Sequence, residues 1–157
     1  MLIVAESFYG NTTQVAEQIA GGLRSKGGTV RVASPGESPK LDGVDLLVVG
    51  APTQMRRLPN ARTRQMAQAR GVVPPAVGVA DWLAALSLPK GLRAAAFDTA
   101  LAGGFAGSAA KAIRQRLRRL GADVVAEASF IVEGADTPHL VDGEADRAAH
   151  WGAGLSS

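Results

Sequence analysis

The sequence predicts an α/β domain in which helices pack on both faces of a parallel sheet. Short apolar runs recur along the chain, segments with helical periodicity separate them, and turns rich in Gly or Pro divide the two kinds of segment. Regular alternation of strands and helices is typical of parallel sheets, whose crossover connections are usually helical. At 157 residues, 46% of them hydrophobic, the chain is expected to form a single domain over residues 1–157.

Five segments have the composition of strands. The run Leu2–Ala5 is apolar throughout and Val44–Gly50 is nearly so, as expected for strands buried on both faces. Residues 29–33 alternate in polarity, residues 92–97 precede a turn-like Asp-Thr pair, and residues 124–132 form the last apolar run. Helices are expected between them, at residues 11–26, 60–68, 79–86 and 110–120, and from Asp142, as N-cap, to Leu155. In the last helix, Trp151 is expected to face the sheet as a core residue.

The turn between the first strand and the first helix is predicted to hold an anion. The first turn of a helix has N–H groups without intrahelical partners and a partial positive charge, and a phosphate satisfies both. Gly10 can take the positive φ that a tight turn needs. No carboxylate lies between Ser7 and Ala16. The polar donors of this turn are Ser7, Asn11, Thr12 and Thr13. The alternative is an ordinary capped helix, because Asn11 and Gln14 have the spacing of a capping box.

Two further segments follow the predicted central strands and are functional candidates. Residues 51–77 are irregular, contain several prolines, and are strongly basic. Their arginines are Arg56, Arg57, Arg62, Arg64 and Arg70. Residues 98–108 form a second predicted loop with three glycines. Loops at the carboxyl ends of parallel strands line ligand crevices in open α/β sheets.

Composition excludes several classes of function. The absence of Cys rules out disulfides, thiol catalysis and Cys-ligated metal, and His139 and His150 are too isolated to suggest a metal site. The apolar runs are too short for a membrane span and the N-terminus lacks the features of a signal peptide, so we expect a cytoplasmic protein that binds no membrane. The arginines of residues 114–119 are expected to form a solvated face and not a nucleic-acid surface, because no aromatic residues interleave with them.

The motifs resemble those of the flavodoxin family. Ser7-Phe8-Tyr9-Gly10-Asn11-Thr12 matches the family's phosphate loop, Ser/Thr-x-Thr/Tyr-Gly-x-Ser/Thr. Gly50-Ala51-Pro52-Thr53 is similar to its Gly-Ser/Thr-Pro-Thr at the end of the third strand, and the second flavin loop would begin at Phe97-Asp98-Thr99. This resemblance covers Leu2 to Leu155 and implies a three-layer flavodoxin-like sandwich with a five-stranded parallel sheet of order 2-1-3-4-5. A response-regulator receiver shares that order, but its strand-end acids and lysine are absent here.

The resemblance implies that the ligand is flavin mononucleotide (FMN), with the isoalloxazine between residues 52–58 and 98–104. The implied function is a redox protein, either an electron carrier or a small quinone-type reductase, whose partner is a protein or a small-molecule electron acceptor. A homo-oligomer is compatible with this. The residues implied to bind FMN are Ser7, Phe8, Tyr9, Gly10, Asn11, Thr12, Thr13, Pro52, Thr53, Gln54, Met55, Arg56, Asp98, Thr99, Gly103 and Gly104.

The loops expected around the flavin ring depart from the family pattern. Gln54, Met55 and Arg56 stand where flavodoxins usually place a Trp, and Phe105 is the only aromatic residue near the second loop. The alternative is therefore a protein that binds flavin weakly or not at all, a binding or interaction module whose phosphate loop holds another anion. Hydrolase or phosphatase chemistry is a weaker alternative, because the chain has neither Cys nor a Ser-His-Asp pattern.

Overall fold

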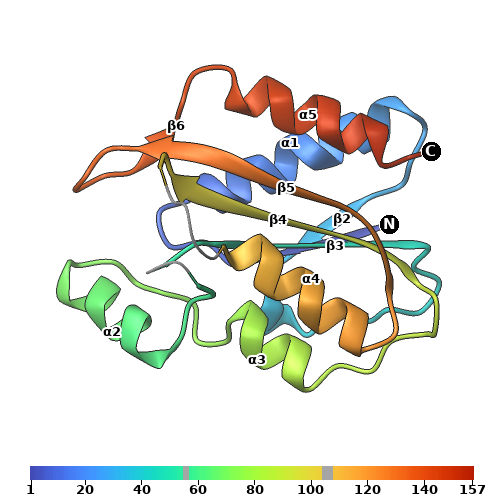
Figure 1. Ribbon diagram of the computed structural model, residues 1–157, viewed down its shortest axis with the longest axis horizontal. Coiled ribbons are helices and arrows are strands. Elements are labelled where there is room, and N and C mark those ends of the chain that lie inside the picture. The colour runs from blue at the N-terminus through green and yellow to red at the C-terminus, as the bar shows by residue number, and fades with distance from the viewer. Residues whose placement is uncertain (55–56, 104–107) are drawn as a thin grey trace.

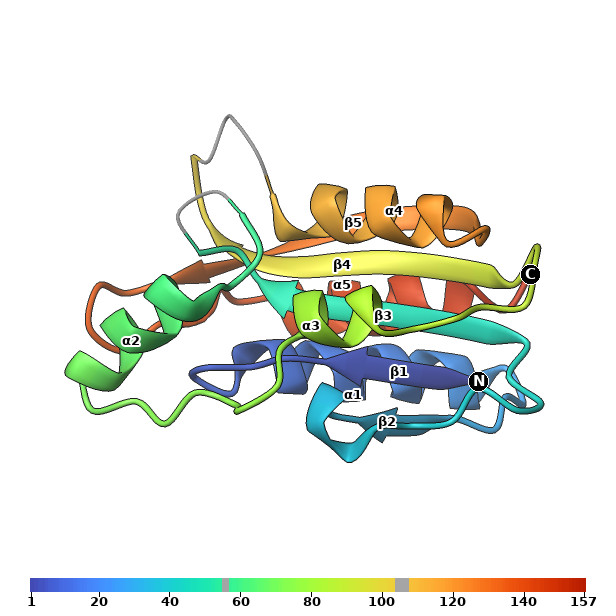
Figure 2. The same cartoon turned by 90° about the horizontal axis from the view of Figure 1, so that it is seen from below.

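The structure is a computed structural model that describes residues 1–54, 57–103 and 108–157. Its strands form one sheet of order β2-β1-β3-β4-β5-β6. Helices α1 (Asn11–Ser25) and α5 (Glu144–Gly154) cover one face of this sheet, and α3 (Val79–Ala84) and α4 (Ala109–Arg119) cover the other (Figures 1 and 2). The predicted three-layer flavodoxin-like arrangement, with its strand order 2-1-3-4-5, is confirmed.

Five of the strands are parallel, and a short antiparallel strand extends the sheet. The strands are β1 (Leu2–Ala5), β2 (Arg31–Ala33), β3 (Leu46–Pro52), β4 (Arg93–Leu101), β5 (Asp123–Glu133) and β6 (His139–Leu140). β6 pairs antiparallel with the end of β5. It was not predicted from the sequence, because a strand of two residues is too short to show an alternating pattern.

β4 is longer than predicted. Asp98 and Thr99, expected to begin a loop, lie inside the strand, where Asp98 pairs with Ala51 and Ser129 in the neighbouring strands. The prediction was wrong because an Asp-Thr pair is typical of turns, whereas here pairing on both sides continues to Pro52 and Val132. The polar pair is therefore held in the middle of the sheet.

Other boundaries differ by a few residues. The N-cap of α5 is Gly143, with φ 88°, and not Asp142. α3 ends at Ala84, before the predicted end at residue 86, and β2 begins only at Arg31. A short 3₁₀ helix, Pro35–Glu37, lies in the predicted loop. Helix α2 (Ala61–Ala69) lies near its predicted position, with Asn60 as a side-chain N-cap.

Each face of the sheet has its own hydrophobic core. Between the sheet and α1 and α5, Phe97, Phe130 and Trp151 pack edge to face, with ring centroids 6.0–6.5 Å apart. Trp151 therefore belongs to the core, as predicted. On the other face, Val49 of β3 belongs to the same buried cluster as Leu83 of α3. In the described ranges, no helix is both long and apolar enough to cross a membrane.

Two glycines let α1 and α5 approach backbone to backbone. A Cβ at Gly22 would lie 2.0 Å from the carbonyl oxygen of Ala149, and one at Gly152 would lie 2.3 Å from that of Ile19. Gly21, its neighbour in α1, is exposed, and a Cβ there would meet nothing within 4 Å. The close contact between α1 and α5 thus requires glycine at position 22 but not at position 21.

We expect Gly22→Ala to lower the free energy of unfolding by roughly 1–3 kcal/mol, since the methyl group would overlap the backbone of α5. Gly21→Ala is the matched control and should raise it by roughly 0.5–1 kcal/mol, because Ala is the better helix former. Urea unfolding of the three proteins measures both values. Equal effects of the two substitutions would contradict the close helix contact.

Candidate functional site

An open pocket lies at the carboxyl edge of the sheet, where β1, β3 and β4 end. Its volume is about 190 Å³. The loop between β1 and α1, the end of β3, the end of β4 and the turn between β5 and β6 form its walls. The lining residues are Ser7, Phe8, Tyr9, Asn11, Thr12, Pro52, Thr53, Gln54, Arg70, Thr99, Ala100, Leu101, Val132, Gly134, Ala135 and Pro138.

The N-terminus of α1 opens onto this pocket without a side-chain cap. Gly10 is the N-cap residue, with φ 88°, and the first turn holds no acidic residue. Among the described residues, nothing accepts a hydrogen bond from the amides of Asn11, Thr12 and Thr13. The side chain of Asn11 instead donates to the carbonyl oxygen of Pro138, at 2.7 Å. The capping-box alternative is therefore wrong, and the positive end of α1 faces the pocket.

The hydroxyl groups of this turn point in different directions. Ser7 Oγ accepts a hydrogen bond from the amide of Gly10 at 3.0 Å, which fixes the turn. Thr12 is buried, and its Oγ1 lies 2.8 Å from Thr99 Oγ1 on β4. Thr13 is exposed and lines a separate depression beside β2. Of these hydroxyls, those of Ser7 and Thr12 belong to residues that line the candidate site.

The neighbouring helix N-terminus, that of α4, is capped from within the protein. The amide of Ala109 donates to Thr53 Oγ1 at 2.9 Å, and that of Ala110 donates to Asp98 Oδ2 at 3.0 Å. The amide of Lys111 donates to Ser108 Oγ. Of these two helices, α4 has partners for its first amides, whereas the first amides of α1 have none among the described residues.

Asp98 lies behind the pocket wall and does not line the pocket. Its carboxylate is fully buried and also accepts hydrogen bonds from the hydroxyls of Thr53, at 2.9 Å, and Ser129. Thr53 and Thr99, on either side of it, do line the pocket. The side chain predicted to contact the flavin therefore joins β3, β4, β5 and α4 to each other.

The structure brings most of the predicted site residues together. The predicted residues that line the pocket are Ser7, Phe8, Tyr9, Asn11, Thr12, Pro52, Thr53, Gln54 and Thr99. Gly10, Thr13, Asp98 and Gly103 are not among the lining residues. Met55, Arg56, Gly104 and Phe105 lie outside the described residues. In the described part of the chain, no three His, Asp or Glu side chains form a group suited to a metal ion.

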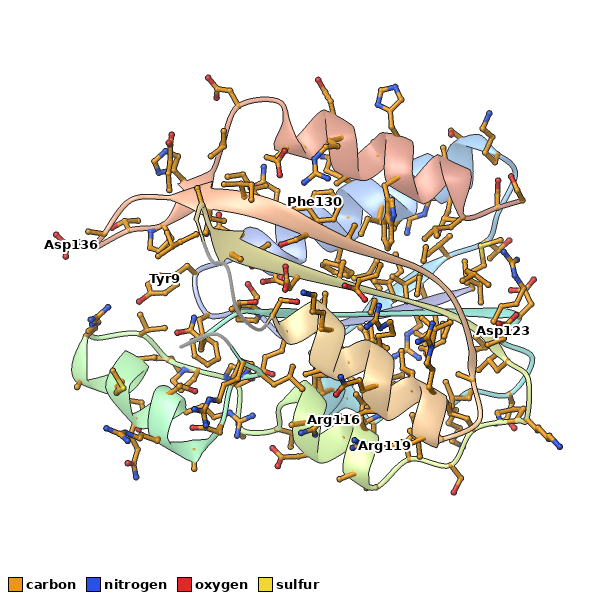
Figure 3. All side chains as sticks on the ribbon, in the orientation of Figure 1. Tyr9, Arg116, Arg119, Asp123, Phe130 and Asp136 are labelled. Atoms are coloured by element: carbon orange, nitrogen blue, oxygen red, sulfur yellow. The ribbon has the colours of Figure 1, made fainter. Side chains whose placement is uncertain are left out.

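One wall of the pocket was missed by the sequence analysis. The turn between β5 and β6 contributes Gly134, Ala135 and Pro138, and α2 contributes Arg70 through its C-terminal end. Gly134, with φ 104°, and Pro138 flank this turn and were the only signals available. Tyr9 lies between this turn and α2 (Figure 3). It gives the pocket an aromatic side chain from the turn between β1 and α1.

Comparison with known proteins agrees with this geometry. The sequence profile of the flavodoxin domain family matches residues 2–69, which include the turn before α1 and the end of β3. No curated protein matches the sequence significantly. The family match over the first part of the chain supports a relationship to the flavodoxin family. The matched segment contains two of the three motifs on which the resemblance depended, Ser7–Thr12 and Gly50–Thr53.

Solved flavodoxins share the fold of this protein along its whole length. A flavodoxin from the domain Archaea superposes with a TM-score of 0.67 and 23% identity, covering 99% of this chain and 94% of the other. Oxidised flavodoxin 1 from Bacillus cereus gives 0.68 and 22%, covering 98% and 94%. Two-electron reduced Megasphaera elsdenii flavodoxin gives 0.64 and 20%, covering 99% and 98%.

A buried glutamate anchors the segment between β3 and β4. Glu6, directly after β1, is fully buried and accepts a hydrogen bond from the amide of Val79 at 3.0 Å. Arg64 of α2 lies 3.4 Å from Glu6 and 3.3 Å from Asp81. Burial raises the pKa of Glu6, although the Val79 amide and Arg64 oppose the shift. Glu6 therefore fastens α2 and α3 to the sheet beside the pocket.

The pKa of Glu6 predicts how it affects stability. Because folding raises this pKa, the contribution of Glu6 is largest at low pH and is lost as pH rises from about 4.5 through the folded-state pKa. The difference in unfolding free energy between wild type and Glu6→Gln should therefore fall across this range. Urea unfolding at a series of pH values measures it.

Glu144→Gln provides a control of opposite sign. A hydrogen bond from Arg147 holds the pKa of Glu144 below its ordinary value, so its contribution is present above about pH 4.5 and is lost as pH falls. The difference between wild type and Glu144→Gln should rise with pH. Differences that change in the same direction for both variants would contradict the assigned environments.

We expect Asp98→Asn to lower the free energy of unfolding by roughly 2–4 kcal/mol, because an amide cannot replace every hydrogen bond that the buried carboxylate accepts. Asp123→Asn, at the exposed start of β5, should change it by less than about 0.5 kcal/mol. Thermal or urea unfolding provides the measurement. A stable Asp98→Asn protein would show that the network is not essential.

Proposed function

We propose that this protein is a member of the flavodoxin family that binds FMN and transfers electrons, as a carrier or as a small quinone-type reductase. The observation that supports this most directly is the uncapped N-terminus of α1, which opens onto a pocket at the carboxyl edge of a flavodoxin-like sheet. A phosphate group suits this position because it complements the free amides and the helix dipole. The family match to residues 2–69 favours FMN as the source of that phosphate.

The residues of the pocket fit a molecule with an anionic end and a flat, largely apolar end. Under this proposal, Ser7, Thr12 and the first amides of α1 hold the phosphate. Segments 52–58 and 98–104 flank the ring, and Pro52 and Leu101 give the described part of these walls apolar surface. FMN, when bound, supplies the electron-accepting chemistry, and the protein binds and orients it.

The hydroxyl of Thr12 provides a test of the phosphate position. We expect Thr12→Val to weaken FMN binding by roughly 1–3 kcal/mol, about 5- to 150-fold in Kd, if this hydroxyl contacts the dianion. Thr13→Val is the matched control one residue away, since the side chain of Thr13 is exposed beside β2 and should not affect binding. Titration of the apoprotein, followed by flavin fluorescence, measures both constants. Equal affinities of the two variants would place the phosphate elsewhere.

The second candidate is a flavin-free module that binds another anion. One observation favours it. The turn before α1 has all the residues of the phosphate motif, whereas aliphatic Leu101, Val132 and Pro138 contribute to the pocket walls. Purification separates the two functions. A yellow protein that absorbs at about 450 nm supports the redox function, and so does submicromolar binding of added FMN. Absence of binding up to millimolar FMN would overturn it and leave the anion-binding module.

A further inference from the structure

We propose that the exposed face of α2 is the docking surface for an acidic protein that exchanges electrons with this one. This proposal rests on the proposed function, because it names the chemistry of the redox partner at the same site. The docking face consists of Arg62 and Met66 of α2, Arg70 at its C-cap, and the exposed Arg57 of the segment that precedes the helix. Its position, its charge and its exposed apolar centre each support the proposal.

The face lies next to the candidate flavin pocket. Met66 and Arg70 line a small depression together with Tyr9, and Arg70 also lines the main pocket. Arg62, Met66 and Arg70 are spaced by four residues, which places them on one side of the helix. α2 projects at the carboxyl edge of the sheet, beyond the ends of the central strands (Figures 1 and 2). A protein seated on α2 would therefore lie beside the pocket.

The charge of this face has no internal partner. Between Asp45 and Asp81 the chain contains five arginines and no acidic residue. Arg64 is used by the fold, in its ion pairs with Glu6 and Asp81. Arg57, Arg62 and Arg70 are exposed, and no described carboxylate lies within 4.0 Å of them. Their positive charge is therefore directed to solvent and would attract an acidic surface.

Exposed apolar side chains lie at the same edge. Met66 is 42% exposed and Leu101, on the pocket wall, is 60% exposed. A basic rim around apolar groups is suited to a protein interface, in which apolar contacts are surrounded by polar ones.

The opposite side of the pocket carries a different charge. Asp136 lies at the tip of the turn between β5 and β6 (Figure 3), and Glu133 is paired with His139 at 3.1 Å. The acidic partner is therefore expected to approach from the α2 side. This difference in charge between the two sides of the pocket favours one orientation of the bound partner, which a uniformly basic edge would not.

Electron transfer to proteins of opposite charge tests this inference. The FMN-loaded protein is reduced without oxygen and mixed with acidic plastocyanin or with basic cytochrome c. Each acceptor molecule takes one electron, so two oxidise one two-electron-reduced FMN, whose protons pass to solvent. We expect plastocyanin to react faster at low salt and to slow as salt rises from about 10 to 200 mM, since screening weakens the attraction.

Two double variants identify the surface responsible. Arg57→Glu with Arg62→Glu should slow the reaction with plastocyanin by about tenfold or more at low salt. Arg118→Glu with Arg119→Glu makes the same change in net charge in the last turn of α4, whose C-terminal end lies away from the carboxyl edge of the sheet (Figure 1), and should slow it less than about twofold. Equal slowing by both variants, or a preference for cytochrome c, would overturn the docking surface.

Two further results separate the remaining explanations. A protein that does not retain FMN would overturn the proposed function, and this inference with it, before any kinetic measurement. Sedimentation with vesicles that contain about one-fifth phosphatidylserine tests a lipid surface as the occupant. Binding to these vesicles that is lost in the Arg57→Glu, Arg62→Glu variant would assign the face to a membrane and overturn the protein partner. Absence of such binding is the expected result.

Discussion

The buried carboxylate of Asp98 is the interaction on which the functional edge depends. It accepts hydrogen bonds from side chains or amides that belong to the end of β3, to β5 and to the start of α4. A carboxylate without partners would be costly at this depth, so these groups must stay together for the fold to be stable. Because Thr53 and Thr99 lie on either side of this network and line the pocket, the same constraint fixes two of its walls.

This arrangement also explains why one helix end is left free. At α4 the groups that would attract an anion already have partners in Thr53, Asp98 and Ser108. At α1 the N-cap residue, Gly10, has no side chain, and the side chain of Asn11 holds the turn before β6. The fold thus satisfies the N-terminus of α4 and leaves the first amides of α1 without a partner among the described residues, as the proposed anion site requires.

The sequence predicted the features that depend on local pattern. The apolar runs predicted the parallel strands and the turn before α1 predicted the position of Gly10, whereas the sheet order came from the resemblance to the flavodoxin family. The position of Asp98 could not be predicted, because a polar residue inside a strand becomes favourable only through partners distant in sequence. The wall formed by Gly134 to Pro138 was missed for the same reason, since its contact with Asn11 spans most of the chain. The contacts with the flavin ring that were predicted for residues 55–56 and 104–107 stay predictions.

The charged residues near the pocket can be sorted by whether the fold uses them. Arg64 and Arg62 are neighbours on α2, yet Arg64 turns inward to Glu6 and Asp81, whereas Arg62 remains exposed. The ion pair between Arg64 and Glu6 holds α2 against the end of β1. The other arginines of α2 then lie at the edge of the pocket. Charge that stabilises the fold and charge that is left to a partner thus come from one short helix. The composition of residues 51–77 alone could not distinguish the two, because it shows the excess of arginine but not which side chain finds a buried acid.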